Sequence, residues 1–284
     1  MALALAVDIG GTKLAVGVVD DEGEVRARAQ AETPKEDAET VFGTLASLVE
    51  EARTGDEVVC GVGCGGPMKP GGTEVSPLNI PAWRDFPLRP RLAEATALPT
   101  FIDNDAKALA LGEGWRGAAE GCRHFIGMVV STGVGGGIVL DGRLLDGNGG
   151  NAGHIGHVLV EPDGRECACG ARGCLEAYAS GPSIAAMTGR PPEEAGPEPI
   201  ERTGTLVGRA VASVVHLLDL RLAVVGGSVA LGFGEPFFTA AQAELDRSAR
   251  LDFATGARIV PAALGPDGGI VGAARVGFVA LEEG

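Results

Sequence analysis

Apolar residues near the start of the chain come in short runs that a glycine turn interrupts. The run L-A-L-A-V from Leu3 predicts a buried strand, D-I-G-G-T-K predicts a turn, and L-A-V-G-V-V, which ends at Val19, predicts a second strand. The turn D-D-E-G closes this pair, and E-V-R-A-R-A predicts a third strand. The pattern therefore indicates a hairpin with glycine at its bend.

The same order of elements returns later in the chain. The run F-I-G-M-V-V leads into S-T-G-V-G-G-G, which is followed by I-V-L, the turn D-G and R-L-L. We therefore expect two related halves, each of which opens with a hairpin bent at glycine.

Helical periodicity alternates with these strands. The segments that predict helices are Asp37 to Arg53, Asn104 to Gly117, Leu206 to Leu220 and Ile270 to Leu281. Strands that alternate with helices indicate an α/β fold. Two proline-rich segments, M-K-P-G-G-T and G-R-P-P-E-E-A-G-P-E-P, predict exposed loops because proline and glycine break both regular structures.

Length and charge limit the classes of function. A chain of 284 residues, 45% of them hydrophobic, can build two modest cores, so we expect two lobes. A net charge of −15 would repel a phosphodiester backbone, so we expect no nucleic-acid partner. The apolar run at the start lacks a cationic flank and is too short for a bilayer, so we expect no membrane association.

Two glycine turns are candidates for binding phosphate. Asp8 to Lys13, D-I-G-G-T-K, lets backbone N–H groups approach an anion, although an ordinary hairpin turn would look the same. Ser131 to Gly137 repeats this chemistry, and two such turns favour a bound nucleotide. Neither turn leads into G-K-S or G-K-T, which excludes a Walker loop. Gly61 to Gly66 matches G-x-G-x-x-G, but proline and glycine follow where a dinucleotide fold needs a helix.

Two interpretations are open for the polar triplet Asp103 to Asp105, for Asn79 and for Trp83. Asp103 or Asn104 could cap the helix that follows, while Asp105 at the strand end could act as a general base toward a sugar hydroxyl. Asn79 in S-P-L-N-I-P-A-W could be a turn residue or a sugar contact, and Trp83 could be a core residue or a stacking platform. By sequence alone the capping interpretation is favoured for Asp103 to Asp105, whereas the local sequence does not separate the alternatives for Asn79 and Trp83.

The loop from Gly156 to Glu176 predicts a zinc site. It carries His157, Cys167, Cys169 and Cys174 in the spacing H-x9-C-x-C-x4-C. A Cys₃His set fills a tetrahedron and leaves no open position for water, so the predicted zinc is structural. Clustered cysteines suit a metal in a reducing compartment better than a disulfide framework. For Cys60, Cys64 and Cys122, outside this spacing, we expect small buried residues.

These motifs together resemble the ROK family of sugar kinases. The resemblance rests on D-I-G-G-T-K, N-I-P-A-W, D-N-D-A, S-T-G-V-G-G-G, V-V-G-G-S-V and, most specifically, C-A-C-G-A-R-G-C-L-E. It implies a two-lobed α/β fold of the actin-like ATPase (ribonuclease H-like) type, and an ATP-dependent kinase that phosphorylates the 6-hydroxyl of a hexose or N-acetylhexosamine. The expected domains are 1–115 plus 268–284, and 116–267 with the zinc loop 156–176, so the C-terminal helix would pack onto the first lobe.

The resemblance also implies residue roles and partners. Asp105 would be the catalytic base, and Asp8 would lie near the magnesium ion of Mg-ATP. The expected sugar contacts are Gly65, Asn79, Asn104, Asp105, His154, His157 and Glu176. The expected ATP contacts are Asp8, Gly10, Gly11, Thr12, Lys13, Thr132, Gly133, Gly226 and Gly227. We further expect a cytoplasmic homodimer or homotetramer, and it stays open whether polyphosphate can replace ATP.

One position departs from the common family pattern. Many members read A-G-E-x-G-H, whereas this sequence reads A-G-H-I-G-H, with His154 in place of the glutamate. A carboxylate accepts two hydroxyl hydrogen bonds, while a neutral imidazole offers one donor and one acceptor, so preference at sugar carbons 1 and 2 should change. This form resembles the N-acetylmannosamine kinases of the family, and the alternative is a glucokinase that tolerates histidine.

A second class of function in the same family is a sugar-sensing transcription regulator. Such regulators carry a DNA-binding helix-turn-helix ahead of the first phosphate motif, and only seven residues precede Asp8 here. The acidic charge and the carboxylate at Asp105 also favour the kinase, so we expect an enzyme.

Overall fold

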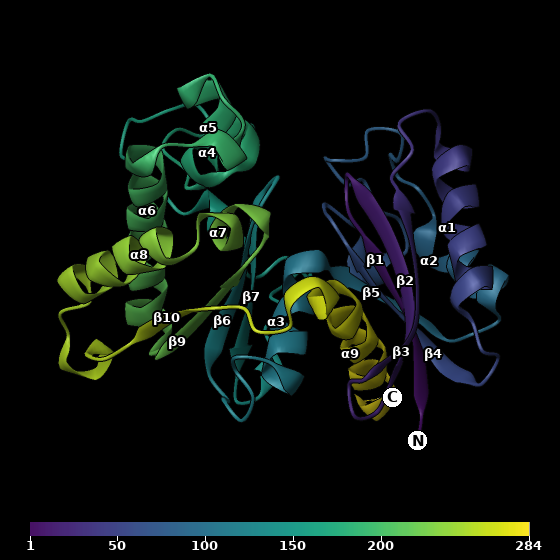
Figure 1. Cartoon of the computed structure of the whole chain (residues 1–284). Helices are drawn as coiled ribbons and strands as arrows, with labels where there is room; N and C mark the ends of the chain where they lie inside the picture. Colours follow the sequence, from purple (N-terminus) through teal and green to yellow (C-terminus); the bar gives the residue numbers. More distant parts are fainter. Residues whose placement is uncertain (284) are drawn as a thin grey trace. The chain divides into compact units, whose positions relative to one another are not determined.

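The computed structural model describes residues 1–283, which divide into two compact units, both drawn in Figure 1. Unit 1 contains residues 1–117, 146–151 and those from Ala263 onward. Unit 2 contains Ala118–Leu145 and Ala152–Ala262. The short segment Asp146–Asn151 therefore groups with unit 1 although its neighbours in sequence lie in unit 2.

Unit 1 is built on a five-stranded mixed sheet. Its strands in spatial order are β3 (Val25–Glu32), β2 (Lys13–Asp20), β1 (Leu3–Ile9), β4 (Glu57–Cys64) and β5 (Thr100–Asn104). The hairpin partners β1, β2 and β3 are antiparallel, whereas β4 and β5 run parallel to β1. The predicted strand, glycine turn and strand at the start of the chain are confirmed.

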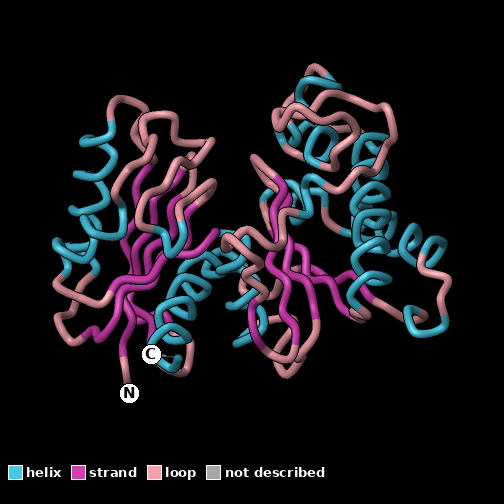
Figure 2. Tube along the Cα trace, turned by 180° about the vertical axis from the view of Figure 1, so that it is seen from behind, coloured by secondary structure: helices cyan, strands magenta, loops and turns pink. Residues whose placement is uncertain are grey.

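Helices cover both faces of this sheet, as the cyan segments in Figure 2 show. They are α1 (Ala38–Ala52), α2 (Leu88–Thr96), α3 (Asp105–Arg116) and α9 (Gly268–Glu283), with short 3₁₀ turns η1 (Pro70–Gly72) and η5 (Gly265–Asp267). Along β1 the side chains alternate between faces. Leu5 and Val7 join the larger core under α1 and α2, while Ala4 and Ala6 face α9.

Small residues let α9 approach the sheet closely. A Cβ atom on Gly61 of β4 would lie 2.0 Å from the carbonyl oxygen of Ala273, so only glycine fits there. Similarly, a Cβ atom on Gly272 would lie 2.3 Å from the carbonyl oxygen of Ala108 in α3. The alanine face of the sheet and these glycines therefore dock α9 against both β4 and α3.

Unit 2 repeats the sheet of unit 1. Its strand order is β10 (Arg258–Pro261), β9 (Leu222–Gly226), β6 (Phe125–Val130), β7 (Val134–Leu140) and β8 (Arg143–Leu144). Here β6, β7 and β8 are antiparallel, and β9 and β10 run parallel to β6. The two sheets thus have the same sequence of parallel and antiparallel strand pairs, which confirms the prediction of two related halves.

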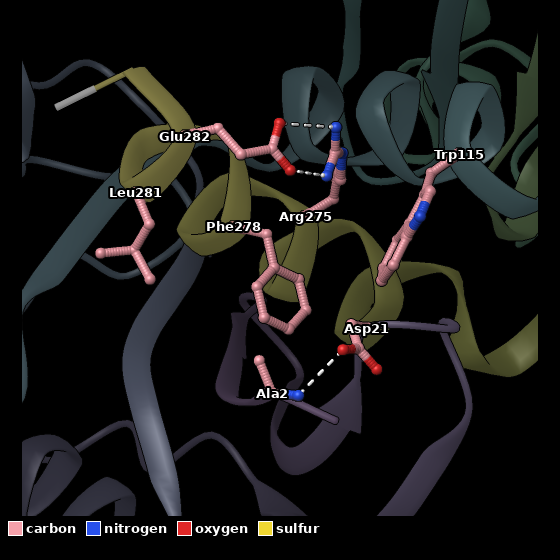
Figure 3. Close-up of a pocket in the computed structure, with 7 residues that line it drawn as sticks. All are labelled: Ala2, Asp21, Trp115, Arg275, Phe278, Leu281 and Glu282. Carbon is pink, nitrogen blue, oxygen red and sulfur yellow. Dashed lines mark hydrogen bonds and ion pairs between the residues drawn. The ribbon is translucent and has the colours of Figure 1, made fainter.

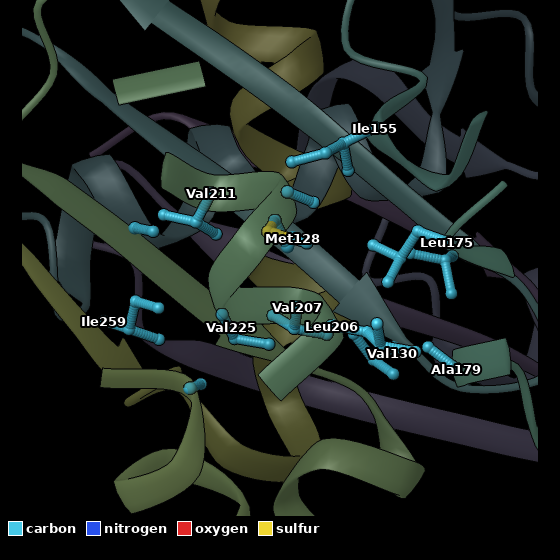
Figure 4. Close-up of a cluster of buried hydrophobic side chains, with 14 of the residues drawn as sticks. Met128, Val130, Ile155, Leu175, Ala179, Leu206, Val207, Val211, Val225 and Ile259 are labelled. Atoms are coloured by element: carbon cyan, nitrogen blue, oxygen red, sulfur yellow. The ribbon is translucent and has the colours of Figure 1, made fainter. Parts of the chain in front are cut away.

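Helices and the cysteine-rich loop surround the sheet of unit 2. The helices are α4 (Glu176–Ala179), α5 (Gly181–Thr188), α6 (Pro197–Leu218), α7 (Ser228–Phe233) and α8 (Glu235–Ser248), with 3₁₀ turns η2 (Ile155–His157), η3 (Pro192–Glu194) and η4 (Asp252–Ala254). Figure 4 shows Ile155 and Leu175, one from each end of the cysteine-rich loop, among core side chains such as Met128 and Val207. Both ends of this loop are therefore anchored in the core of unit 2.

Several predicted elements need correction. Helix α6 begins at Pro197 rather than Leu206, so part of the predicted proline-rich loop is helical; prolines fit a first turn because its N–H groups have no intrahelical acceptor. Strand β7 begins at Val134, so the second turn is shorter than the glycine run predicts. Cys122 is exposed in the turn after α3, against the expectation of burial, whereas Cys60 and Cys64 are buried. Among residues 1–283, no helix is long and apolar enough to cross a bilayer.

Candidate active site

The predicted carboxylates of unit 1 gather at the carboxyl ends of its parallel strands. Pairing between β1, β4 and β5 sets Asp8, Gly63 and Asp103 side by side in one row. Asp105 follows as the first residue of α3. A Cβ atom on Gly63 would lie 3.7 Å from the Cα of Asp105 and 3.9 Å from Oδ1 of Asp8. Because Gly63 has no side chain, nothing from β4 separates these two acids.

Asn104 and Asp105 both contact the first turn of α3. The side chain of Asn104 is the N-cap and accepts a hydrogen bond from the backbone N–H of Ala106 at 3.0 Å. Oδ1 of Asp105 accepts from the same N–H at 2.9 Å. The capping interpretation is therefore confirmed for Asn104, and a base role for Asp105 stays a prediction.

Asp8 is the most perturbed carboxyl of this row. Burial, and secondarily the neighbouring carboxylate of Asp105, raise the pKa of Asp8 to about 6, while Lys13 and Arg28 oppose the shift. A cation beside Asp8 would stabilise its charged form and so offset the effects of burial and of the Asp105 carboxylate. The arrangement fits Mg²⁺, which typically takes one or two protein carboxylates together with substrate phosphates and water.

The first glycine turn is held tightly between β1 and β2. The N–H of Gly10 donates to the carbonyl of Lys13 at 2.9 Å, and the Thr33 hydroxyl donates to the carbonyl of Gly10 at 2.7 Å. Thr12 at the tip is exposed. A Cβ atom on Gly11 would lie 2.7 Å from the Cβ of Asn79, so the turn needs glycine in order to lie against that residue.

Asn79 is a half-buried polar residue beside this turn. Its Oδ1 is buried and accepts no hydrogen bond from any residue in the described part of the chain, which leaves an acceptor for a ligand. Gly65 lies next to it, since a Cβ atom there would be 3.3 Å from Oδ1. Trp83 is a core residue, fully buried and stacked on Phe86.

Sequence reasoning missed the residues that hold this region in place. Arg84 donates to the carbonyls of Pro77 and Ile80 at 3.0 and 3.2 Å and so fixes the loop that carries Asn79. Nothing in the local sequence marks those carbonyls as its partners.

Lys107 was also missed. It is 2% exposed and pairs with Asp103 at 3.0 Å and with Asp146 at 2.7 Å. It also donates to the carbonyl of Gly150 at 3.2 Å, which ties the segment Asp146–Asn151 to α3. Its spacing of four residues from Asp103, which directly precedes the predicted helix, was the available signal.

The second glycine turn of unit 2 joins the ends of β6 and β7. The N–H of Ser131 donates to the carbonyl of Gly133 at 2.9 Å, and Thr132 at the tip is exposed. Val129 pairs with Gly226 on β9, which brings Gly226 and Gly227 beside the turn. Gly227 has φ 96°, and a Cβ atom on it would lie 2.4 Å from the carbonyl oxygen of Val130. The predicted nucleotide contacts of this unit therefore lie together.

The predicted zinc ligands converge. One ligand atom each from His157, Cys167, Cys169 and Cys174 lies within 4.8 Å of the others. The Sγ atoms of Cys169 and Cys174 are 3.7 Å apart, as are Sγ of Cys167 and Nδ1 of His157. Zinc lies about 2.3 Å from a sulfur ligand and about 2.0 Å from a nitrogen ligand. In a tetrahedron these bonds place two sulfur atoms about 3.8 Å apart, and a sulfur and a nitrogen atom about 3.6 Å apart. The Cys₃His set therefore fits a four-coordinate zinc ion.

The remaining predicted sugar contacts of unit 2 flank this cluster. Glu176 begins α4, two residues after Cys174, and its Oε2 accepts the N–H of Val134 at 2.8 Å. His154 precedes η2 and is exposed, with its ring centroid 6.1 Å from that of His157. His154 and Glu176 thus lie three and two residues in sequence from the terminal ligands of the cluster, His157 and Cys174.

A separate pocket of about 260 Å³ lies in unit 1 beside α9 and contains none of the predicted site residues (Figure 3). Trp115 and Phe278 meet edge to face in it at 5.7 Å between ring centroids. Arg275 and Glu282 form a bidentate ion pair at 2.8 and 3.2 Å along its rim.

Known proteins are similar in sequence to most of this chain. The model of the ROK family matches residues 4–277. An N-acetylmannosamine kinase of Citrobacter koseri is 40% identical over 247 residues, which cover 81% of this chain and 84% of that protein. A glucokinase of Thermotoga maritima is 32% identical over 306 residues, which cover 96% of this chain and 96% of that protein.

A solved structure matches as well. The ROK family glucokinase of Streptomyces griseus in complex with glucose and AMPPNP superimposes with a TM-score of 0.85 at 30% identity, covering 98% of this chain and all of that one. The mixed α/β architecture with two five-stranded sheets is therefore that of the actin-like sugar kinases. The chain belongs to the ROK family and is a ROK sugar kinase.

Proposed function

We propose that this kinase transfers the γ-phosphoryl group of ATP to the 6-hydroxyl of a hexose or N-acetylhexosamine, with N-acetylmannosamine as the favoured substrate. The observation that carries the phosphotransfer proposal is the row of strand ends in unit 1. There Asp105, Asp8 and the unpartnered oxygen of Asn79 lie next to a glycine turn that contacts Asn79 directly.

In the proposed reaction Asp105 is the base. Its carboxylate accepts the proton of the sugar 6-hydroxyl while that oxygen forms a bond to the γ-phosphorus, and the bond from phosphorus to the leaving oxygen of ADP breaks. The backbone amides of the first turn, Gly10 to Lys13, would bind phosphate oxygens. Asp8 would hold the magnesium ion, which when bound offsets the negative charge on the phosphates.

The cysteine-rich loop would serve as a scaffold. A zinc ion held by four protein ligands has no open position, so it would fix the loop without entering the reaction. His157 would bind zinc through Nδ1, which leaves its other ring nitrogen for a sugar hydroxyl. Glu176 and Asn104 would contribute further sugar contacts, and Thr132, Gly133, Gly226 and Gly227 would contact the nucleotide.

His154 supports the choice of sugar. It stands where many ROK kinases have a glutamate, and an imidazole offers one donor and one acceptor instead of two acceptors. The 40% identity to an N-acetylmannosamine kinase points the same way. Glucose is the second candidate, because the relative that covers 96% of the chain is a glucokinase.

An assay of ADP release tests these proposals. The purified protein would be incubated with ATP and Mg²⁺ and, in turn, N-acetylmannosamine, N-acetylglucosamine, glucose and mannose, and the series would be repeated with polyphosphate as donor. We expect the highest kcat/KM for N-acetylmannosamine. A higher kcat/KM for glucose would establish the second candidate, and product analysis by NMR would show whether the phosphate is on carbon 6.

A further inference from the structure

The carboxylate of Glu176 touches the nucleotide turn of unit 2. Its Oε2 accepts a hydrogen bond of 2.8 Å from the N–H of Val134, the residue at which the turn passes into β7. A Cβ atom on Gly133 would lie 3.2 Å from the same oxygen. Glu176 belongs to α4, more than forty residues further along the chain. The contact therefore joins the end of the cysteine-rich loop to a turn that the sequence predicts to bind ATP.

The rest of the turn is held by other groups. The carbonyl of Ser131 accepts the N–H of Gly181 at 2.8 Å, and the hydroxyl of Ser131 lies 2.8 Å from that of Ser228. Both bonds fix the residue that enters the turn. The residue that leaves the turn, Val134, pairs with Val130 in the sheet, and Glu176 adds a side-chain hydrogen bond to its N–H. Removing the carboxylate would therefore loosen the exit of the turn while Ser131 stays anchored.

Glu176 itself is firmly placed. Its main-chain carbonyl accepts the hydroxyl of Ser183 at 2.9 Å and the N–H of Ser180 at 3.3 Å, and Cys174 of the zinc cluster precedes it by two residues. Within residues 1–283, no donor bonds its second oxygen, Oε1. A carboxylate has about four acceptor positions, so one oxygen can keep the bond to Val134 while the other accepts from a ligand.

We propose that Glu176 is a positioning residue for the nucleotide as well as a contact for the sugar. This inference rests on the proposed function, and it adds that one carboxylate serves both substrates. A sugar hydroxyl bonded to Oε1 restricts rotation of the carboxylate and so stabilises the conformation of the turn. Coupling of this kind is reciprocal, so nucleotide would tighten sugar binding by the same factor.

The test is nucleotide affinity in the absence of sugar. AMPPNP with Mg²⁺ would be titrated by calorimetry into the zinc-loaded wild type, Glu176→Ala and Glu176→Gln. We expect Glu176→Ala to weaken binding by about ten-fold, the loss typical of a hydrogen bond to a charged acceptor. Glu176→Gln should stay within about three-fold, since its amide oxygen can still accept from Val134. The matched control is Glu193→Ala, which removes an exposed glutamate of η3 in the same unit.

Zinc content and the thermal transition of each variant show that unit 2 is intact. If Glu176→Ala fails that check, Glu176→Asp replaces it, because the shorter side chain retracts the carboxylate from Val134. Unchanged AMPPNP affinity in the intact variant would overturn the inference even if a sugar is phosphorylated. Conversely, weakened AMPPNP binding in a protein that phosphorylates no sugar of the panel would support the nucleotide role and refute the proposed substrates.

Discussion

At the scale of single residues, neighbours in sequence carry different functions. Asn104 caps α3, whereas Asp105, the next residue, lies beside the buried carboxyl of Asp8. Glycine at position 63 makes this possible, because a side chain there would enter the space between the two acids. The site therefore depends as much on the absence of a side chain as on the acids themselves.

Replacing Asp105 tests the base directly. In Asp105→Asn, we expect kcat to fall by several orders of magnitude, since general base catalysis and charge placement are lost together, while sugar binding changes little. Steady-state kinetics and a sugar titration measure the two effects. The control is Asp56→Asn, which makes the same change at an exposed position of unit 1. Near-normal turnover in Asp105→Asn would show that the base lies elsewhere.

His154 is the residue at which we expect substrate choice to change. His154→Glu restores two acceptors, so the ratio of kcat/KM for glucose over N-acetylmannosamine should rise, by roughly ten-fold or more if one hydroxyl contact is gained. Because the side chain of His154 is exposed, we expect this change to have little effect on folding. An unchanged ratio would mean that another residue sets the preference.

The sequence identified residues with chemistry of their own but not those that act through others. The spacing of His157 and the three cysteines predicts the cluster that the fold brings together. Arg84 acts through nearby carbonyl oxygens, which no sequence pattern marks as its partners. The spacing from Asp103 indicates one partner of Lys107 but not the distant segment that it also binds. The partner of Glu176, a backbone N–H of another element, was invisible for the same reason.

At the scale of elements, the cysteine-rich loop is unusual because it has little regular structure. Its backbone is held by short bridges, such as Leu159 with Cys174 and Glu166 with Arg172, and by its two core anchors. A loop of this kind needs the cross-link that a metal supplies, because it buries little apolar surface of its own.

Removal of zinc should therefore abolish activity by loosening His157 and Glu176. The protein would be treated with a chelator, returned to excess Mg²⁺ so that ATP binding is not limited by magnesium, and assayed with its zinc content measured. Cys169→Ser should behave like the stripped protein, while Cys122→Ser, at an exposed cysteine outside the cluster, should keep both zinc and activity. Full activity in a preparation free of metal would contradict this account.

Helices α6 and α8 are joined by a buried acid. Glu244 is 6% exposed. Hydrogen bonds from Arg247 lower the pKa of Glu244; burial opposes this shift, and hydrogen bonds from Ser248 and Arg209 add to it. Arg209 also donates to the carbonyl of Val160 at 2.8 Å, so this network reaches the cysteine-rich loop.

A lowered folded-state pKa fixes the sign of the pH dependence. The stabilisation from Glu244 is complete above its ordinary pKa of about 4.3 and is lost as the pH falls through the lower folded-state pKa. Glu244→Gln should thus reduce the free energy of unfolding at pH 7 by about 1–3 kcal/mol, and the difference from wild type should narrow at pH 4. Thermal melts at both pH values measure it, with Glu198→Gln on the exposed start of α6 as control. A constant difference would assign the effect to packing.

Element boundaries were less predictable than element types. The alternation of strands and helices gave the α/β class and the repeated hairpin, because those patterns follow from burial. The start of α6 was misplaced because Pro197 and Pro199 indicate a loop by composition yet suit a first helical turn. Helices α2, α5 and α8 were missed for two reasons. Each has glycine or proline at or just before its first residue, which indicates a turn, and each has only a short apolar stripe.

At the scale of the whole molecule, charge separates the two classes of function in the family. With a net charge of −15 and a pI near 4.7, the protein as a whole repels polyanions. A polyanion can bind only where backbone amides and a metal ion meet its charge locally. A nucleotide satisfies that condition because glycine turns and Mg²⁺ meet its phosphates locally.

We therefore expect no measurable binding to DNA. Fluorescence anisotropy with a labelled random duplex at about 0.15 M salt, with and without sugar, should show no change up to micromolar protein. Binding that weakens steeply with salt would instead indicate phosphate contacts and favour a regulator. A basic DNA-binding protein run in parallel controls for the sensitivity of the probe.

The docking of α9 also bears on how the chain is made. Unit 1 takes its alanine-lined face from strands near the start of the chain and the helix that covers this face from residues that follow all of unit 2. During synthesis the ribosome releases β1 and β4 long before α9, so that face of the sheet stays open while unit 2 emerges and folds. The order of translation thus makes unit 2 the earlier domain to complete, although it comes second in sequence.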